Sequence, residues 1–348
     1  MMAVAVFGAS GYQGGLVLAE LRRRGLRPLL VGRSAARLRE AARRADLPET
    51  VRVADTADEE ALAHAFADAR AVIDCAGPFA RLGPPVLRAA LAAGCHYTDT
   101  SGEQRHVRWV LDAMDDAARR AGVTAVPAAT DGCLLPDLAA RLLSDRLGPL
   151  DSLFITHVVE GGTSSRGSLR SLVEGMDDIR SGGVSYRDGA WTEAAPEPAE
   201  VLLPDGAAVR TARFPLPEVV TIPRATPVRN LTAVVDADLR SRLSAAPPPA
   251  ESIAALPDGP DPGARAAQRF TYLLDALATS GARARVTLRG RDTYGTTAVT
   301  AVETAVRLLA APPLPGALTA SQALRPGSFL ASLSAHGVDH AVSAPAPV

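Results

Sequence analysis

The stretch Val6-Phe7-Gly8-Ala9-Ser10-Gly11-Tyr12-Gln13-Gly14 decides the fold of this chain. It is a GxxGxxG motif between a strand-like run, Ala3–Phe7, and a segment with helical spacing. Gly8 would make a tight turn, Gly11 would let the backbone approach a diphosphate, and Gly14 would let helix and strand pack closely. A diphosphate would then rest on free N–H groups at the positive end of the helix. The alternative is a glycine-rich turn without a ligand. The motif predicts that the nucleotide lies against Gly8, Ser10, Gly11, Tyr12, Gln13 and Gly14.

The residues that follow the motif alternate short apolar runs with helical patterns, which is typical of βαβ units around a parallel sheet. The expected strands are 3–7, 29–31, 51–53, 71–76, 96–98 and 123–127. The expected helices lie near 14–24, 35–44, 58–67, 83–93 and 104–121. Gly25, Gly94 and Gly122 each follow a helical pattern, where a left-handed C-cap is expected. We therefore expect an α/β chain that begins with a Rossmann-type, doubly wound parallel sheet.

Past Asp151 the alternation fades. Residues 153–159 and 282–289 have strand-like patterns, and 296–311 returns to helical spacing before Pro312. Seven prolines in 193–228 predict extended edges and loops, and Pro247–Pro249 and 257–263 predict surface loops. The second domain is expected to be α+β, with a mixed and largely antiparallel sheet.

We divide the chain into three parts. Residues 1–150 would form the Rossmann dinucleotide-binding domain and 151–295 the α+β substrate domain. Residues 296–348 would form a C-terminal segment that packs back on the first domain.

The end of the second expected strand indicates which nicotinamide cofactor binds. An NAD site normally has a carboxylate there for the ribose hydroxyls. This chain has Arg33 and Ser34 instead, which can hold a 2′-phosphate, and Asp55 after the third strand can lie near the adenine amino group. The alternative is a solvated arginine at the start of a helix. We predict NADP as the cofactor.

Composition narrows the function classes. The 348 residues carry 47% hydrophobic and 22% charged residues and a formal net charge of −1, so no overall field attracts nucleic acid. Three widely spaced cysteines, the lack of a signal-peptide pattern and the lack of a long uncharged apolar stretch lead us to expect a cytoplasmic protein without a membrane span. The histidines show no metal-binding spacing, so we expect no metal. The sequence leaves open whether the protein forms a homodimer.

Several motifs together resemble the saccharopine dehydrogenase-like oxidoreductase family, and most of all its trans-acting enoyl reductase branch. The motifs are GASGYQG (8–14), VGRS (31–34), DCAGPF (74–79), HYTDTSGE (96–103), GGTSS (161–165), GRDTYG (290–295) and LRPG (324–327). The resemblance implies a Rossmann domain interrupted by a substrate domain, and reduction of C=N or C=C bonds.

The resemblance also assigns roles to single residues. It implies that Ala76, Gly77, Pro78 and Phe79 lie beside the nicotinamide ribose. It implies that Asp99 and Glu103, an acidic pair after the fifth strand, contact the substrate. The loop 128–137 should border the substrate through Asp131, although its sequence departs from the pattern of relatives.

Hydride transfer also requires a proton source. Tyr97 and His96 are the catalytic candidates, because we expect them at the carboxyl end of the fifth strand, and Tyr12 is a third candidate. Each has a structural alternative: a buried ring with a satisfied hydroxyl, a satisfied histidine, or a side chain that lines the cleft. Cys75 and Cys95 fit buried small side chains better than nucleophiles.

The sequence therefore predicts an NADPH-dependent reductase acting on a C=C or C=N bond of a small or carrier-bound substrate, with C=C ahead. It lacks the Ser–Tyr–Lys pattern of short-chain dehydrogenases. The alternative is a non-catalytic NADP-binding regulator or redox sensor.

Overall fold

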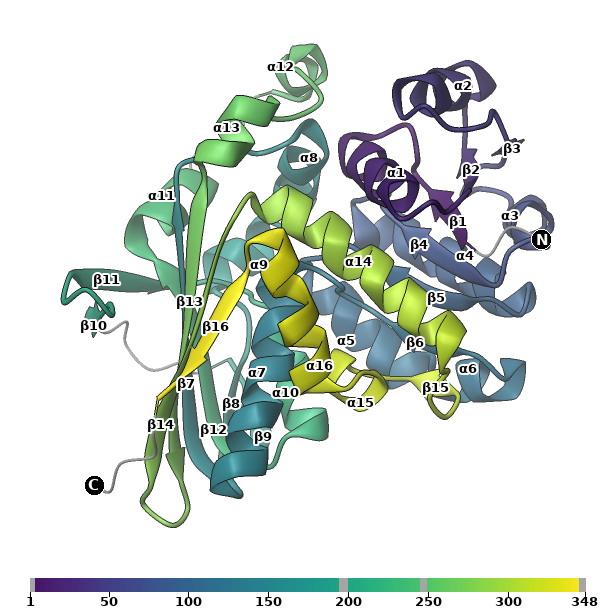
Figure 1. Cartoon of the computed structure of the whole chain (residues 1–348). Coiled ribbons are helices and arrows are strands. Elements are labelled where there is room, and N and C mark those ends of the chain that lie inside the picture. The colour runs from purple at the N-terminus through teal and green to yellow at the C-terminus, as the bar shows by residue number, and fades with distance from the viewer. Residues whose placement is uncertain (1–3, 194–199, 245–248, 344–348) are drawn as a thin grey trace.

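The glycine motif lies at the centre of a seven-stranded parallel sheet (Figure 1). The computed structural model describes residues 4–193, 200–244 and 249–343. The strand order is β15–β6–β5–β4–β1–β2–β3, which is the Rossmann order with one strand added beside β6. The strands are β1 (Val4–Phe7), β2 (Leu29–Gly32), β3 (Val51–Val53), β4 (Ala71–Asp74), β5 (His96–Asp99), β6 (Thr124–Val126) and β15 (Gly316–Ala317). This confirms the predicted fold class.

Helices cover both faces of this sheet, so its strands are apolar on both sides. In β1, Val4 and Val6 face one hydrophobic core, whereas Ala5 and Phe7 face the other. The first face is covered by α1 (Tyr12–Arg23), α2 (Ala35–Arg44) and α14 (Thr293–Ala310). The second face is covered by α3 (Glu59–Phe66), α4 (Phe79–Ala92), α5 (Gln104–Ala113) and α6 (Asp115–Ala121).

The glycines predicted as C-caps have left-handed backbones, with φ of 71° at Gly25, 67° at Gly94 and 69° at Gly122. One predicted helix, 104–121, is divided into α5 and α6 at Met114.

A second sheet has the order β10–β11–β12–β7–β13–β14–β16, with β8 and β9 attached to β12. Only β12 and β7 run parallel among its described neighbours; the other pairs are antiparallel. Its strands are β7 (Leu150–Glu160), β8 (Ser185–Arg187), β9 (Ala190–Thr192), β10 (Glu200–Leu202), β11 (Ala208–Arg213), β12 (Val228–Asp236), β13 (Arg269–Ala278), β14 (Arg283–Arg291) and β16 (Asp339–Val342). A mixed, largely antiparallel sheet was predicted here.

The helix α7 (Asp131–Leu147) was not predicted, because we expected a loop at 128–137. It packs against β7, β13 and β14 of the second sheet and against α14 (Figure 1). Thr130 caps its start by accepting a hydrogen bond from the Cys133 N–H. The helix is buried on nearly all sides, so its sequence lacks the period of a surface helix.

The remaining helices surround the second sheet. They are α8 (Arg166–Glu174), α9 (Met176–Ser181), α10 (Glu218–Ala225), α11 (Ala237–Ser244), α12 (Ala250–Ala255), α13 (Pro262–Ala267), α15 (Ala320–Ala323), α16 (Pro326–Ser332) and the 3₁₀ helix η1 (Leu333–His336). Within 193–228 we expected no helix, so α10 corrects that prediction. Residues 194–199 and 245–248 lie outside the described residues, and Pro262 begins α13 rather than lying in a loop.

The end of the chain contacts both sheets. Helix α14 packs against α1, β4 and β5, and β15 extends the first sheet beside β6. Strand β16, in contrast, pairs with β14 of the second sheet. The division at residues 150 and 295 stays a prediction.

Candidate active site

A cavity with a volume of about 1780 Å³ runs between the two sheets. On one side it is lined by the glycine loop after β1 and by the segments after β2 to β5. On the other side it is lined by residues 159–172, by Tyr272 and by the start of α14. We call it the interdomain cavity. It lies at the carboxyl ends of parallel strands, where ligands bind in open α/β sheets.

The glycine loop has the geometry that a diphosphate needs. Gly8 has a φ of 73°, a left-handed backbone that favours glycine. A Cβ atom on Gly14 would lie 2.3 Å from the Gly8 carbonyl oxygen, so Gly14 allows α1 to pack against the loop. Helix α1 starts after Gly11. Among the residues that the structure describes, no side chain caps this end, and the first turn has no acidic residue. Its first N–H groups therefore fit an anion such as a diphosphate.

Two arginines line the end of the interdomain cavity near β2. Arg33, 75% exposed, has its Nε 3.8 Å from Asp55 Oδ2. Arg37 on α2 also lines the cavity, and its Nη2 is 3.5 Å from the Ser10 carbonyl oxygen. Ser34 lines the cavity and caps α2. The sequence analysis missed Arg37, although the RSAAR spacing places it one helical turn after Arg33. It also overlooked that Asp55 lies next to Arg33.

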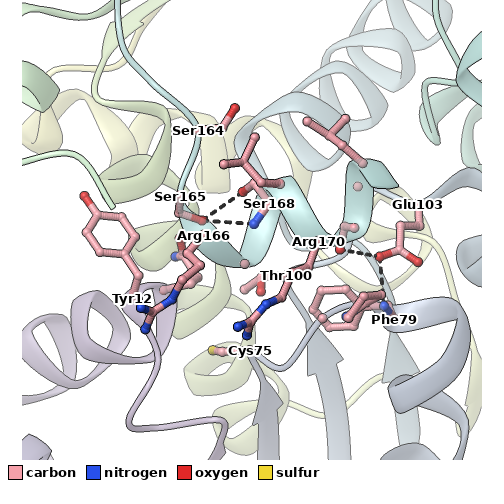
Figure 2. Close-up of a pocket in the computed structure, with 18 of the residues that line it drawn as sticks. Tyr12, Cys75, Phe79, Thr100, Glu103, Ser164, Ser165, Arg166, Ser168 and Arg170 are labelled. Atoms are coloured by element: carbon pink, nitrogen blue, oxygen red, sulfur yellow. Dashed lines mark hydrogen bonds between the residues drawn. The ribbon is translucent and has the colours of Figure 1, made fainter. Parts of the chain in front are cut away.

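The segment 75–79 follows β4 and borders the cavity, as the resemblance implies for a site beside the nicotinamide ribose. The Ala76 N–H donates to Asp74 Oδ1 at 2.9 Å. A Cβ atom on Gly77 would lie 2.9 Å from Ser171 Oγ on α8, so a glycine lets the two sides of the cavity approach. Figure 2 shows this side, with Cys75 and Phe79 below α8. Burial raises the pKa of the Cys75 thiol well above its usual range, so this thiol stays protonated at neutral pH.

Glu103 lines the cavity, but its carboxylate already accepts hydrogen bonds from other groups of the protein. The N–H groups of Phe79 and Ala80, at the start of α4, donate to it at 2.8 Å and 2.7 Å, and Ser171 Oγ donates at 2.8 Å (Figure 2). Glu103 therefore joins the start of α4 to α8. The contact with substrate that the resemblance implies for Glu103 would have to displace one of these bonds.

The two catalytic candidates lie away from the cavity. Tyr97 has no exposed surface, and its hydroxyl donates to Asp99 Oδ2 at 3.0 Å and lies 3.3 Å from Asp74 Oδ2. Burial raises the pKa of Tyr97 and of Asp74 well above their usual ranges, which favours the protonated form of each. These contacts support the structural alternative for Tyr97.

His96 begins β5, so our expectation that it lies at the carboxyl end of that strand was wrong. The prediction failed because β5 continues for three residues after His96 and ends at Asp99. Its Nδ1 accepts a hydrogen bond from the Thr124 N–H at 3.1 Å. Burial lowers the pKa of His96, which favours the neutral ring.

Asp99 is fully buried and bound to protein groups. Besides Tyr97, it accepts hydrogen bonds from the N–H groups of Ser101 and Ala128, and His106 Nε2 lies 2.9 Å away. It is not among the residues that line the cavity. The substrate contact implied for Asp99 therefore finds no support in this geometry; its neighbours indicate a role in holding loops.

Asp131 does line the cavity and is 7% exposed. Tyr272 on β13 donates its hydroxyl proton to Asp131 Oδ2, and Thr297 Oγ1 donates to Asp131 Oδ1 at 2.8 Å. Burial raises the pKa of Asp131, and it raises the pKa of Tyr272 well above its usual range. Sequence reasoning missed Tyr272, because it is one apolar position of a long strand.

Two buried residues support this pair. The rings of His157 and Tyr272 stack with centroids 4.3 Å apart, and His157 Nε2 lies 2.7 Å from Glu218 Oε1. Glu218 has no exposed surface. No motif marks these residues, which come from β7 and α10.

A segment of the second half of the chain covers the glycine loop. The Tyr12 hydroxyl donates to the Pro260 carbonyl oxygen at 2.6 Å, and Arg166 on α8 forms an ion pair with Asp258. Burial raises the pKa of Tyr12 to about 12, so this tyrosine holds its proton and is a weak acid at neutral pH. Tyr12 therefore closes the site at this end.

The family comparison identifies the first domain. Residues 4–126 match the family described as the saccharopine dehydrogenase NADP binding domain. The match covers the part of the chain that contains the glycine loop, Arg33 and Arg37. The description of that family names NADP, which is the cofactor that the glycine loop and the two arginines fit.

Two relatives show how far the likeness extends. A lipid droplet localized protein of Caenorhabditis elegans is 32% identical over 151 residues, which are 40% of this chain and 35% of that protein. A Mycobacterium tuberculosis protein, described as a candidate trans-acting enoyl reductase, is 28% identical over 239 residues, 61% of this chain and 57% of that protein. The chain thus matches between about a third and somewhat over half of their length.

The fold outside the NADP-binding domain also has a solved counterpart. Apo saccharopine dehydrogenase (L-Glu forming) from Saccharomyces cerevisiae superposes with a TM-score of 0.62, over 99% of this chain and 100% of that chain. The sequences are 14% identical, so this likeness concerns the fold alone.

Among residues 4–193, 200–244 and 249–343, no helix has the length and apolar character to cross a membrane. Within the same ranges, no group of three His, Cys, Asp or Glu side chains is arranged to hold a metal ion.

Proposed function

We propose that the protein is an NADPH-dependent reductase that reduces a C=C or C=N bond of a small or carrier-bound substrate, with C=C first. One observation carries this proposal. A single cavity joins the glycine loop of the NADP-binding domain to a buried carboxyl group, Asp131, that burial biases toward its protonated form. Bound NADPH supplies a hydride, and the reduction then needs a proton donor within the same cavity.

Asp131 is the proposed proton donor, in place of Tyr97 and His96. Its raised pKa lets it hold a proton nearer to neutral pH, where a general acid is most effective. Tyr272 and Thr297 fix the orientation of its carboxyl group through their hydroxyls. We assign these two residues a positioning role, because Tyr272 itself holds its proton too tightly to release it.

The ring of His157 packs against the residues that hold Asp131. It stacks on Tyr272, and a Cβ atom on Gly132 would lie 3.7 Å from His157 Cε1. The Glu218 carboxylate lies next to Nε2 of the imidazole. This stack supports a fixed position for the Tyr272 hydroxyl and, through it, for Asp131.

The test is direct. Purified protein is mixed with NADPH and with unsaturated carboxylic acids, enoyl thioesters or cyclic imines of graded size, and oxidation of NADPH is followed by its absorbance near 340 nm. We expect turnover with NADPH and little with NADH, and faster turnover with the enoyl substrates. Tight NADPH binding without turnover on any substrate would favour the alternative, an NADP-binding regulator or sensor. No binding of NADPH would defeat both.

A further inference from the structure

Seven arginines line the interdomain cavity, and six of them have partners within the described residues. The partners are Asp55 for Arg33, the Ser10 carbonyl for Arg37, Glu174 for Arg81, Asp178 for Arg105, Asp258 for Arg166 and the Val159 carbonyl for Arg242. Arg170, on α8, makes no hydrogen bond or ion pair with any residue that the structure describes. The Arg170 side chain is exposed where it borders the cavity, so its guanidinium donors can bind an anion from outside the chain.

Contacts on both sides of Arg170 hold α8 in place. Ser171, the next residue, donates to Glu103, which caps α4. At the start of the helix, the Ser165 N–H donates to the Tyr294 hydroxyl at 2.7 Å, and Arg166 pairs with Asp258. The backbone that carries Arg170 is therefore fixed to the NADP-binding domain and to α14.

The side chain of Arg170 points toward the reactive end of the site. In Figure 2 it extends from α8 toward Cys75 and Thr100, which follow β4 and β5. The diphosphate site, in contrast, lies at the start of α1 after β1. Arg170 is directed at the region beside the segment 75–79, where a substrate must lie to receive a hydride.

We propose that Arg170 forms an oxyanion subsite for the substrate, which binds a carboxylate adjacent to the bond that is reduced. This inference rests on the proposed reductase function and names the substrate class: unsaturated compounds that carry an acidic group. A planar guanidinium binds a carboxylate through two parallel hydrogen bonds, which fix orientation as well as position. Leu169 and Leu172 of the same helix also line the cavity and would contact the apolar part of such a substrate.

The test uses a small probe pair, crotonate and its uncharged analogue crotonamide, titrated into the NADP⁺-loaded protein by calorimetry. We expect saturable binding of crotonate and much weaker binding of crotonamide. Arg170→Gln should lower the crotonate affinity by roughly 10-fold or more, the usual scale for a lost charge-assisted hydrogen bond. Arg105→Gln is the matched control, because it removes the same charge from the same cavity while Asp178 already compensates it. It should leave crotonate binding within about twofold.

Inorganic phosphate and NADP⁺ itself distinguish the sources of the anion. Phosphate that competes with crotonate, and does so only when Arg170 is present, would support the oxyanion subsite and extend it to substrates with a phosphate. Arg170→Gln that weakens NADP⁺ binding but leaves crotonate binding unchanged would overturn the inference and assign Arg170 to the cofactor. Crotonate that fails to bind the wild-type protein, or binds both proteins equally, would also overturn it.

The same titration in protein without cofactor separates this inference from the proposed function. Wild-type protein that binds no NADP⁺, yet binds crotonate through Arg170, would keep the subsite while the reductase proposal fails. NADP⁺ binding and NADPH oxidation without any effect of Arg170→Gln on crotonate would keep the reductase and remove the subsite.

Discussion

The cluster around Tyr97 joins the ends of two central strands to three loops. Asp74 holds the Ala76 N–H, and Asp99 holds the N–H groups of Ser101 and Ala128. Tyr97, Asp74 and Asp99 do not line the interdomain cavity, whereas Ala76 does. At the scale of single residues, these contacts favour a structural role for Tyr97, Asp74 and Asp99.

Changing Tyr97 to Phe tests that assignment. The ring still fills its space, but one buried hydrogen bond to Asp99 is lost, so we expect a stability loss of about 1–3 kcal/mol. Turnover should stay within about twofold of the parent, because the hydroxyl does not reach the cavity. Melting temperature and NADPH oxidation measure the two effects. A rate loss of roughly 10²-fold with unchanged stability would return Tyr97 to a catalytic role.

Asp131→Asn should have the opposite profile. The amide keeps an oxygen that can accept from Thr297, so the fold and NADPH affinity should change little, whereas turnover should fall by roughly 10²-fold or more. In the parent, the acid form is required and its pKa is raised. The rate should therefore be highest at low pH and fall as pH rises through that pKa, and the variant should lose this dependence. A pH–rate profile at saturating NADPH, measured for both proteins, checks the prediction. An unchanged profile in the variant would exclude Asp131 as the donor.

Arg33→Asp tests cofactor choice. It removes one guanidinium and places a carboxylate beside Asp55, so NADPH affinity should fall by roughly 10- to 100-fold and the preference should shift toward NADH. Arg37→Gln should have a smaller effect in the same direction, since Arg33 remains. Fluorescence titration of both cofactors against the parent and both variants measures the preference. Equal affinities for NADPH and NADH in the parent would contradict the assignment.

At the scale of elements, local signals in the first domain were strong enough to predict structure. The strand positions, the glycine loop and the three glycine C-caps follow from short patterns whose physics is local. Helix α7 could not be found this way, because burial on nearly all sides removes its amphipathic period. Helix α10 was not predicted because the surrounding prolines indicated loops. Pro217, however, lies just before the first residue of α10, where proline is tolerated.

The same limit applies to the site. The glycine loop, Arg33 and the 75–79 segment were predicted because each has a motif in one stretch of chain. Asp131 was predicted from resemblance, but its partners Tyr272 and Thr297 are 141 and 166 residues away in sequence. His157 on β7 and Glu218 on α10 are also far apart in sequence and come together only in the folded chain. No pattern in a single segment encodes such contacts.

Gly11, which precedes α1, and Gly14, in the first turn of α1, should respond differently to substitution. Gly14→Ala would place a Cβ atom 2.3 Å from the Gly8 carbonyl oxygen and 2.9 Å from Ala9 Cα, so the protein should lose stability and NADPH binding together. Gly11→Val meets only the Gly8 oxygen, at 3.2 Å, so the fold should persist while the diphosphate space is filled. Thermal melting and NADPH titration of both variants separate the effects. Unchanged NADPH affinity in folded Gly11→Val would mean that this loop is not the phosphate site.

At the scale of the whole molecule, Asp137 links α7 to the C-terminal segment. Its Oδ2 accepts the Ser321 N–H at 2.7 Å, at the start of α15, and burial raises its pKa to about 6. Because the folded-state pKa lies above the ordinary value of 3.8, its stabilising contribution is complete below that pH and is lost as pH rises toward 6. This group should therefore lower the free energy of unfolding by about 3 kcal/mol across that range.

Asp137→Asn isolates this contribution, since the amide stays neutral and can still accept from Ser321. Urea unfolding of the parent and the variant at pH 4 and pH 7 gives the difference. The parent should lose more stability than the variant between the two pH values. Parallel losses in both proteins would show that other groups, such as Asp74, account for the pH dependence.

The positions of α14 and β15 have a consequence for synthesis. A ribosome releases β4, β5 and β6 long before it makes the helix that covers β4 and β5 and the strand that lies beside β6. Until then the nascent chain presents an uncovered apolar face, which is the kind of surface that chaperones bind. The cofactor-binding unit thus matures late in translation, although its glycine loop is among the first residues made. A product that stops after residue 150 would display that face permanently and would be expected to aggregate.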